Sequence, residues 1–258
     1  MSSLRKKSIK NVRSPRRIAA CVEHLPQSFV DQLLAPKRKA KLMKVADTAE
    51  GGERELAEWL WESSQAQAQE ALDTGFIQGI KSGLLDPTDY GGYTVQDAVY
   101  CFNATSYYGI AYEKCKESTL REFIQGRIKS YAGYTEEMFK QWYIKDPRGI
   151  AMGTAAASYS SFEKGVATNS QAIYLLIAML PCEQLWGWLA EQIQPGINDT
   201  NVYSFWIEDN LGGSHKLANF INEHTESYGV RPEVAKGIYK TAMQCEVEFF
   251  RSATIDVV

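Results

Sequence analysis

Apolar side chains recur along most of the chain at intervals of three and four residues, the spacing of one face of an α-helix. Leu56, Trp59 and Leu60 show this spacing first, and good helix formers follow as far as Leu72. The two-residue alternation that is typical of strands is scarce, and no internal repeat is evident. We therefore predict a single all-α domain of roughly ten helices, without a sheet.

The predicted helices follow one another from residue 53 onwards. The first covers 53–72, and a short apolar segment follows at 75–83. Asp86 and Pro87 mark the start of a long apolar helix, because aspartate is a common N-cap residue and proline favours the first helical turn. This helix extends over 90–112, and further helices are predicted over 117–131, 135–144, 150–164, 168–193, 200–210, 214–227 and 231–252.

Charge divides the chain into two parts. Residues 1–44 hold 12 Lys and Arg against two acidic residues, whereas the remainder holds 16 basic and 29 acidic residues and has a net charge of −13. We predict a basic N-terminal extension over residues 1–50 and a helical domain over residues 51–258, separated by a glycine pair. The acidic domain is poorly suited to a polyanion, so any contact with nucleic acid or membrane would have to use the extension.

The cysteines and the N-terminal sequence indicate the cellular compartment in which the protein resides. The five cysteines are widely spaced and form no CxxC pair, which favours reduced thiols in a reducing compartment. The N-terminal sequence lacks the apolar core of a secretory signal, and no apolar run free of polar breaks has the length of a membrane span. We expect a cytoplasmic protein without membrane contact. Organellar targeting is the alternative, because the first 21 residues are rich in Arg and Ser and contain no acid.

One predicted helix is apolar on every side from Ile173 to Leu180, as a central buried helix must be. Pro181 follows, and the helix should bend there because proline donates no hydrogen bond to the carbonyl of Ile177. The next residue is Cys182. A bend beside a thiol can direct that thiol into a cavity, and the alternative is that Cys182 is an inert small residue of the core.

Five segments, in this order, carry a resemblance to a known family. They are FIQGIKSGLLDPTDYGGYTVQDAVY (76–100), AAASYSSF (155–162), YLLIAMLPCEQLWGWL (174–189), VYSFWIEDN (202–210) and CEVEFF (245–250). Together they resemble the active-site blocks of the TenA family, which comprises thiaminase II and aminopyrimidine aminohydrolases. The resemblance covers about residues 55–252, with similar intervals between the blocks.

The resemblance implies an all-α fold of the haem-oxygenase-like type, usually assembled as a homotetramer. Members of the family hydrolyse an amino group from the aminopyrimidine moiety of degraded thiamin, and some also cleave thiamin itself, without a cofactor or metal. We accordingly expect a hydrolase of thiamin salvage, a small aminopyrimidine-like ligand and a homo-oligomer, with no nucleic-acid partner for the helical domain.

The resemblance also implies roles for five residues. Cys182 matches the family's nucleophile, and Glu246 matches the carboxylate that carries a proton to the leaving amine. Asp97 matches the aspartate that orients the substrate ring, and Tyr100 lies one helical turn later on the same face. Tyr159 matches a tyrosine that hydrogen-bonds the ring or the thiol. The set is coherent, because a thiolate can add to an electron-poor ring while a carboxylic acid protonates the departing ammonia.

Two positions depart from the family's pattern. Trp186 stands four residues after the cysteine, where the family usually has Tyr, and Asn210 replaces a tyrosine three residues after Trp-Ile. Compared with tyrosine, Trp186 lacks the hydroxyl group but has an N–H donor. Asn210 is polar like tyrosine, but its side chain is shorter. We expect both in the substrate pocket. Three readings stay open: the family's substrate, a different ring, and a non-catalytic binding or scaffold protein on the same fold.

A metal enzyme on this fold is the remaining alternative. Haem and di-iron sites need histidine, alone or with several carboxylates. The chain has only His24, His215 and His224, all predicted in loops or at helix ends away from the helices with the pocket residues. The supply of ligands therefore argues against metal chemistry.

We expect deletion of residues 1–45 to leave folding and any hydrolase activity largely intact, because these residues lie outside the resemblance. The deletion should instead change the cellular location of the protein or its binding to a partner. Circular dichroism and ammonia release compare the truncated with the full chain, and loss of the folded state would contradict this expectation.

Overall fold

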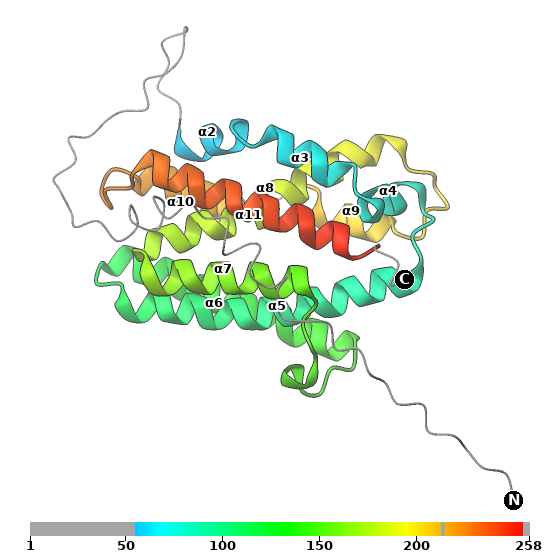
Figure 1. The fold of residues 1–258 in the computed structure, drawn as a ribbon, viewed down its shortest axis with the longest axis horizontal. Coiled ribbons are helices and arrows are strands. Elements are labelled where there is room, and N and C mark those ends of the chain that lie inside the picture. The colour runs from blue at the N-terminus through cyan, green and yellow to red at the C-terminus, as the bar shows by residue number, and fades with distance from the viewer. Residues whose placement is uncertain (1–54, 213–214, 255–258) are drawn as a thin grey trace, which may run out of the picture.

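The computed structural model describes residues 55–212 and 215–254, and this part of the chain is an all-α bundle without a strand (Figure 1). The N-terminal extension predicted over residues 1–50 lies outside the described residues. The α-helices are α2 (Leu56–Glu62), α3 (Gln65–Leu72), α4 (Gly75–Ser82), α5 (Pro87–Lys114), α6 (Ser118–Gln141), α7 (Thr154–Asn169), α8 (Ala172–Ile193), α9 (Ser204–Asn210), α10 (Lys216–His224) and α11 (Pro232–Ser252). Two 3-10 turns join them, η2 (Pro147–Gly149) and η3 (Gln194–Gly196).

Two groups of helices enclose a central one. α5, α6 and α7 lie alongside one another on one side of the bundle, and α2, α3, α10 and α11 lie on the other (Figure 1). α8 contacts α7, α10 and α11, and every residue from Ala172 to Pro181 is buried. The prediction of a central buried helix is therefore confirmed, and α8 continues through Pro181 to Ile193.

The segment Ala172–Gly196 is also long and apolar enough to cross a membrane by length and composition alone, with a mean hydropathy of 1.3 over its most apolar window. However, 72% of that window is buried inside the bundle. The helix at the centre of a packed bundle must be apolar on every side, and this requirement accounts for its composition.

The start of α5 follows the sequence signal. The Oδ1 atom of Asp86 accepts the backbone N–H of Thr88 at 2.7 Å, and Pro87 occupies the first helical turn. α5 then runs for 28 residues and packs against α6 and α7. This contact lets polar residues in the middle of α5 face the interior of the bundle.

The helix predicted over 53–72 is in fact two helices, because the chain breaks at Ser63 and Ser64. The Ser63 hydroxyl donates to the carbonyl of Leu60 at 2.8 Å, and the Ser64 N–H bonds the carbonyl of Trp61, three residues back, at 3.0 Å. Serine competes with the helical hydrogen bonds in this way. The break separates α2 from α3, and both still pack on α11.

The two helices predicted over 117–131 and 135–144 are one continuous helix, α6. A break was expected near Gly133, but a glycine inside a helix costs only about 1 kcal/mol relative to alanine. Buried side chains continue beyond it at Thr135 and Met138. Their packing against the bundle keeps the helix intact. The other predicted bounds differ by a few residues, since α7 begins at Thr154 and α8 at Ala172.

Candidate active site

A cavity of about 280 Å³ lies inside the bundle, where α5, α6, α7, α8, α9 and α11 meet. The seven residues singled out in the sequence all line it: Asp97, Tyr100, Tyr159, Cys182, Trp186, Asn210 and Glu246. They come from five different helices and span 150 positions of the sequence. Helical spacing explains the pairs that share a helix, because residues three or four apart lie on one face.

The thiol of Cys182 and the carboxyl group of Glu246 are in direct contact at the centre of the cavity. The thiol donates to Glu246 Oε1 at 3.1 Å, and the hydroxyl of Tyr159 donates to the same oxygen, also at 3.1 Å. Both tyrosine hydroxyls, of Tyr159 and Tyr100, lie 3.5 Å from the sulfur. The sulfur therefore has one proton acceptor and two hydroxyl groups within reach.

The two residues that depart from the family's pattern behave differently. Trp186 donates its Nε1–H to Glu246 Oε2 at 3.2 Å, so the indole supplies a hydrogen bond to the carboxyl group. Asn210 lines the cavity, but its amide donates to the carbonyl of Trp206 within its own helix at 2.7 Å. Trp186 thus contacts the Cys182–Glu246 pair through Glu246, whereas Asn210 forms part of the wall.

Burial controls the protonation of this pair. It raises the pKa of Glu246 to about 7, although hydrogen bonds from Cys182, Trp186 and Tyr159 act in the opposite direction. Burial, and then the neighbouring Glu246 and Glu163, raises the pKa of the Cys182 thiol well above its ordinary value. The resting site therefore holds a neutral thiol beside a carboxyl group that titrates near neutral pH. Only the ionised carboxylate, present above about pH 7, can accept the thiol proton.

The block CEVEFF contains a second glutamate, Glu248, two residues after Glu246. In the structure Glu246 is 1% exposed and faces the thiol. The side chain of Glu248 is 41% exposed and pairs with Arg251. Glu248 therefore lies outside the site.

Asp97 forms a second polar group in the cavity. Its Oδ2 atom accepts the hydroxyl of Tyr134 at 2.9 Å, and the Cys101 thiol lies 3.9 Å from Oδ1. Burial raises the pKa of Asp97 to about 6, against the lowering effect of these hydrogen bonds. Asp97 is therefore largely ionised at pH 7 and can hold a ligand that offers hydrogen-bond donors.

The sequence analysis missed the wall that α6 contributes. Arg127, Ser130, Tyr131 and Tyr134 line the cavity at helical spacing, and Arg127 pairs with Glu183 at 2.9 Å. Dividing α6 into two predicted helices hid the fact that these side chains share one face. Glu163 was also missed, because a glutamate in the middle of a half-exposed helix gives no sign of burial.

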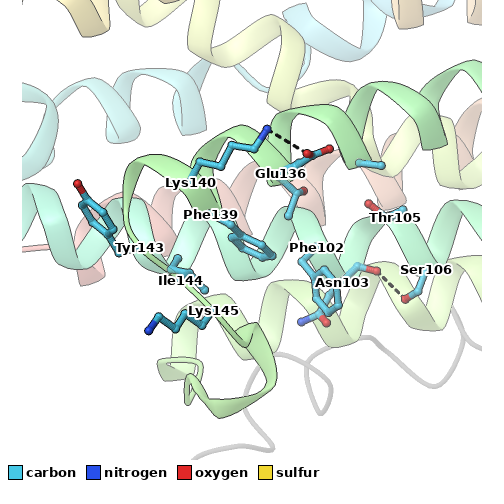
Figure 2. A pocket seen from close by; sticks show the side chains of 12 residues that line it. Phe102, Asn103, Thr105, Ser106, Glu136, Phe139, Lys140, Tyr143, Ile144 and Lys145 are labelled. Atoms are coloured by element: carbon cyan, nitrogen blue, oxygen red, sulfur yellow. Dashed lines mark hydrogen bonds and ion pairs between the residues drawn. The ribbon is translucent and has the colours of Figure 1, made fainter.

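A larger hollow of about 720 Å³ lies elsewhere, between α5, α6 and the segment after α6 (Figure 2). Phe102 and Phe139 line it, and an exposed ion pair joins Lys140 to Glu136 at its edge (Figure 2). None of the seven predicted residues lines it, and its lining contains no thiol. The smaller cavity is therefore the candidate active site.

Comparison with known proteins identifies the family of this chain. The chain matches the sequence profile of the TENA/THI-4/PQQC family over residues 67–255. This chain belongs to that family. Among curated protein sequences no significant match was found. The TenA resemblance found in the sequence is confirmed, and the fold is the all-α, haem-oxygenase-like fold.

Solved structures of TenA homologues resemble this chain. A TenA family transcription regulator from a Silicibacter species has a TM-score of 0.68 and 15% identity, covering 77% of this chain and 96% of its own. A TenA homologue from Pyrococcus horikoshii has a TM-score of 0.64 and 18% identity, with coverages of 78% and 98%. A candidate TenA-like thiaminase from Sulfolobus solfataricus has a TM-score of 0.57 and 15% identity, with coverages of 76% and 95%. At these identities the likeness shows the fold alone.

The described residues also offer no metal site, since no three His, Cys, Asp or Glu side chains among them cluster in a way that could hold an ion. His215 precedes α10 and His224 ends it, and neither lines the cavity. The lining of the cavity combines two thiols, two acidic groups, an arginine and aromatic side chains.

Proposed function

We propose that this TenA-like protein is a hydrolase that removes an amino group from an aminopyrimidine, with Cys182 as nucleophile and Glu246 as proton carrier. The observation that carries the proposal is the 3.1 Å contact between the thiol and a buried carboxyl group whose pKa is about 7. An isolated cysteine is only a few per cent ionised at neutral pH, so a nucleophilic thiol needs an adjacent base. Glu246 supplies that base.

In the first half of the reaction, the thiol proton passes to Glu246 and the sulfur forms a bond to the electron-poor ring. Glu246 then gives this proton to the leaving amine as the carbon–nitrogen bond breaks, and ammonia departs. The raised pKa suits both transfers, because a group that titrates near the working pH can accept and release a proton.

In the second half, water restores the enzyme. A water molecule adds to the carbon that lost the amine, its proton goes to Glu246, and the carbon–sulfur bond breaks. The sulfur then recovers a proton from Glu246. The net change is amine plus water to alcohol plus ammonia, with no redox step and no cofactor.

The remaining residues bind the ring. A cavity of about 280 Å³ accommodates a single substituted ring. Asp97 can accept hydrogen bonds from an exocyclic amine and from a ring nitrogen that carries a proton, and the aromatic rings of Tyr100, Tyr159 and Trp186 provide flat apolar walls. We propose that these contacts orient the aminopyrimidine beside the sulfur.

The experiment is ammonia release by the wild-type chain from 4-amino-5-aminomethylpyrimidine, with cleavage of thiamin as a second reaction. Release from the aminopyrimidine is expected. If the chain binds this compound but acts on neither, the hydrolase proposal is wrong and the binding-protein alternative takes its place.

Asp97→Asn should weaken binding of the pyrimidine about tenfold, because a hydrogen bond to a charged group contributes more than one to a neutral group. The turnover rate should fall as well, since the ring loses its orientation. Calorimetric titration and initial rates measure the two effects. Asp73→Asn, at an exposed aspartate outside the cavity, is the matched control. An Asp97→Asn variant with wild-type affinity would contradict the binding role.

Trp186→Phe should move the acid limb of the pH–rate profile to higher pH. The indole N–H lowers the pKa of Glu246, so its removal raises that pKa, by about one unit for one hydrogen bond to a charged group. A higher pH is then needed before Glu246 can accept the thiol proton. Trp188→Phe, at a tryptophan that packs on Trp61 outside the cavity, should leave the limb unchanged. An unchanged limb in Trp186→Phe would show that Glu246 does not set it.

A further inference from the structure

Glu163 is a buried acid that the proposed reaction does not use. It lies on α7, one helical turn after Tyr159, and is 0% exposed. It does not line the cavity, but it bonds the hydroxyl of Tyr100, which does. A glutamate without any exposure is rare unless it is paired or protonated, so its position requires a physical explanation.

The contacts of Glu163 indicate a neutral carboxylic acid. Its Oε1 accepts the hydroxyl of Tyr100, and no donor bonds its Oε2, which is completely buried. An ionised carboxylate with one oxygen unpaired in the interior would be costly, and burial raises the pKa of Glu163 well above its ordinary value. Its own proton is then available to Tyr100.

Tyr100 links this acid to the reactive sulfur. Its hydroxyl lies 3.5 Å from Cys182 Sγ while it bonds Glu163 on the other side. A phenol has a single proton, which in the resting site is directed to Glu163. When Cys182 loses its proton to Glu246, the sulfur becomes an anion and requires donors. Tyr100 can then turn its proton to the sulfur, and it is a stronger donor if its own oxygen accepts a hydrogen bond at the same time, because linked hydrogen bonds polarise one another.

We propose that Glu163 is a positioning residue for the thiolate: its acid proton turns to the oxygen of Tyr100, and the Tyr100 proton turns to the sulfur of Cys182. No covalent bond changes, since both protons stay on their own oxygens: the hydrogen bond between Tyr100 and Glu163 reverses its direction, and a new hydrogen bond forms from Tyr100 to the sulfur. The pair Tyr100–Glu163 thus resembles the pair Tyr159–Glu246, in which a tyrosine near the sulfur also donates to a buried glutamate. The inference rests on the proposed role of Cys182 as nucleophile.

The test is the rate at which iodoacetamide alkylates Cys182 in the full chain between about pH 7 and pH 10, the range in which ordinary thiols ionise, measured by peptide mass spectrometry. Glu163→Met removes the donor, keeps the length of the side chain and should slow alkylation about threefold to tenfold, the range that one hydrogen bond usually carries. Glu163→Gln should stay near the wild-type rate, because its amide can still donate to Tyr100. The titratable groups around Glu163 are Tyr100, Cys101 and Tyr107 from α5, Tyr159 from α7, Cys182 from α8 and Glu246 from α11, and these variants leave them in place.

Two further variants separate this role from a merely structural one. In a Tyr100→Phe background, Glu163→Met should have no further effect, while Tyr100→Phe alone should slow alkylation at least as much as Glu163→Met. Tyr107→Phe removes another α5–α7 hydrogen bond, to Ser160 at 2.6 Å, and should leave the rate unchanged.

Faster alkylation in Glu163→Met would overturn the proposal, because Glu163 would then be keeping the Tyr100 proton away from the sulfur. Unchanged alkylation would also overturn it, because Glu163 would then have no effect on the thiolate. An equally slow Glu163→Gln variant, an effect that persists without the Tyr100 hydroxyl, or a wild-type rate in Tyr100→Phe would also overturn it. Alkylation requires no substrate. A failure here therefore leaves the hydrolase proposal standing. An absence of ammonia release would leave the effect of Glu163 on the thiolate measurable, but it would remove the role of Cys182 as nucleophile on which this inference rests.

Discussion

Replacement of Cys182 by serine should abolish nearly all turnover, by about a thousandfold or more, while binding of the pyrimidine stays within about threefold of wild type. Serine keeps a hydrogen bond to Glu246 and nearly the same volume, so the cavity should keep its shape. Its hydroxyl is far less acidic and less nucleophilic than a thiol. The loss should therefore appear in kcat and leave ligand affinity almost unchanged.

Ammonia release and calorimetric titration of the pyrimidine measure the two quantities for Cys182→Ser. Cys115→Ser is the matched control, because Cys115 is a buried thiol outside the cavity. This control should retain wild-type activity. A fully active Cys182→Ser variant would refute the nucleophile assignment, and a variant that fails to bind would show that the thiol serves the ligand rather than the reaction.

Glu246→Gln should lower turnover about a hundredfold or more, the usual contribution of a general acid–base group. Tyr159 and Trp186 donate to different oxygens of Glu246, so the single amide oxygen of glutamine can keep one of these two hydrogen bonds. The amide can neither take the thiol proton nor give one to the amine. The acid limb near pH 7 should disappear as well, because the group with the pKa of about 7 has been removed.

The control for Glu246→Gln is Glu248→Gln, two residues further along α11. Glu248 is exposed and bonds Arg251, so its replacement should leave both the rate and the pH profile unchanged. Initial rates between about pH 5 and pH 9, on both sides of the Glu246 pKa, check both expectations. If Glu246→Gln keeps its acid limb near pH 7, another group sets the limb and Glu246 is not the proton carrier.

Much of the fold could be predicted from the sequence because its signals are local. The continuous apolar run before Pro181 required a buried helix, and Asp86 with Pro87 required a helix start. The break between α2 and α3 and the continuity of α6 were predicted wrongly. The break follows from local hydrogen bonds of Ser63 and Ser64 that compete with the helical pattern, whereas the continuity of α6 depends on tertiary packing, because its buried face overrides Gly133.

The candidate site was predictable only where residues matched a family block. Cys182 and Glu246 are 64 positions apart, and no local pattern indicates that their side chains meet. Tyr134, which donates to Asp97, lies outside every block. Glu163 is only one position beyond a block, but its burial arises from the packing of α5 against α7 and is invisible in the sequence.

The most direct test of the account is to trap the covalent intermediate. The full chain is mixed with 4-amino-5-aminomethylpyrimidine, quenched with acid during turnover, digested and mapped by mass spectrometry, with Glu246→Gln in parallel as a variant in which formation of the adduct should be strongly slowed. We predict a pyrimidine adduct on the peptide that contains Cys182, and none on Cys101, the other thiol that lines the cavity. Continuing ammonia release with no adduct on Cys182, or with the adduct on Cys101, would contradict the account.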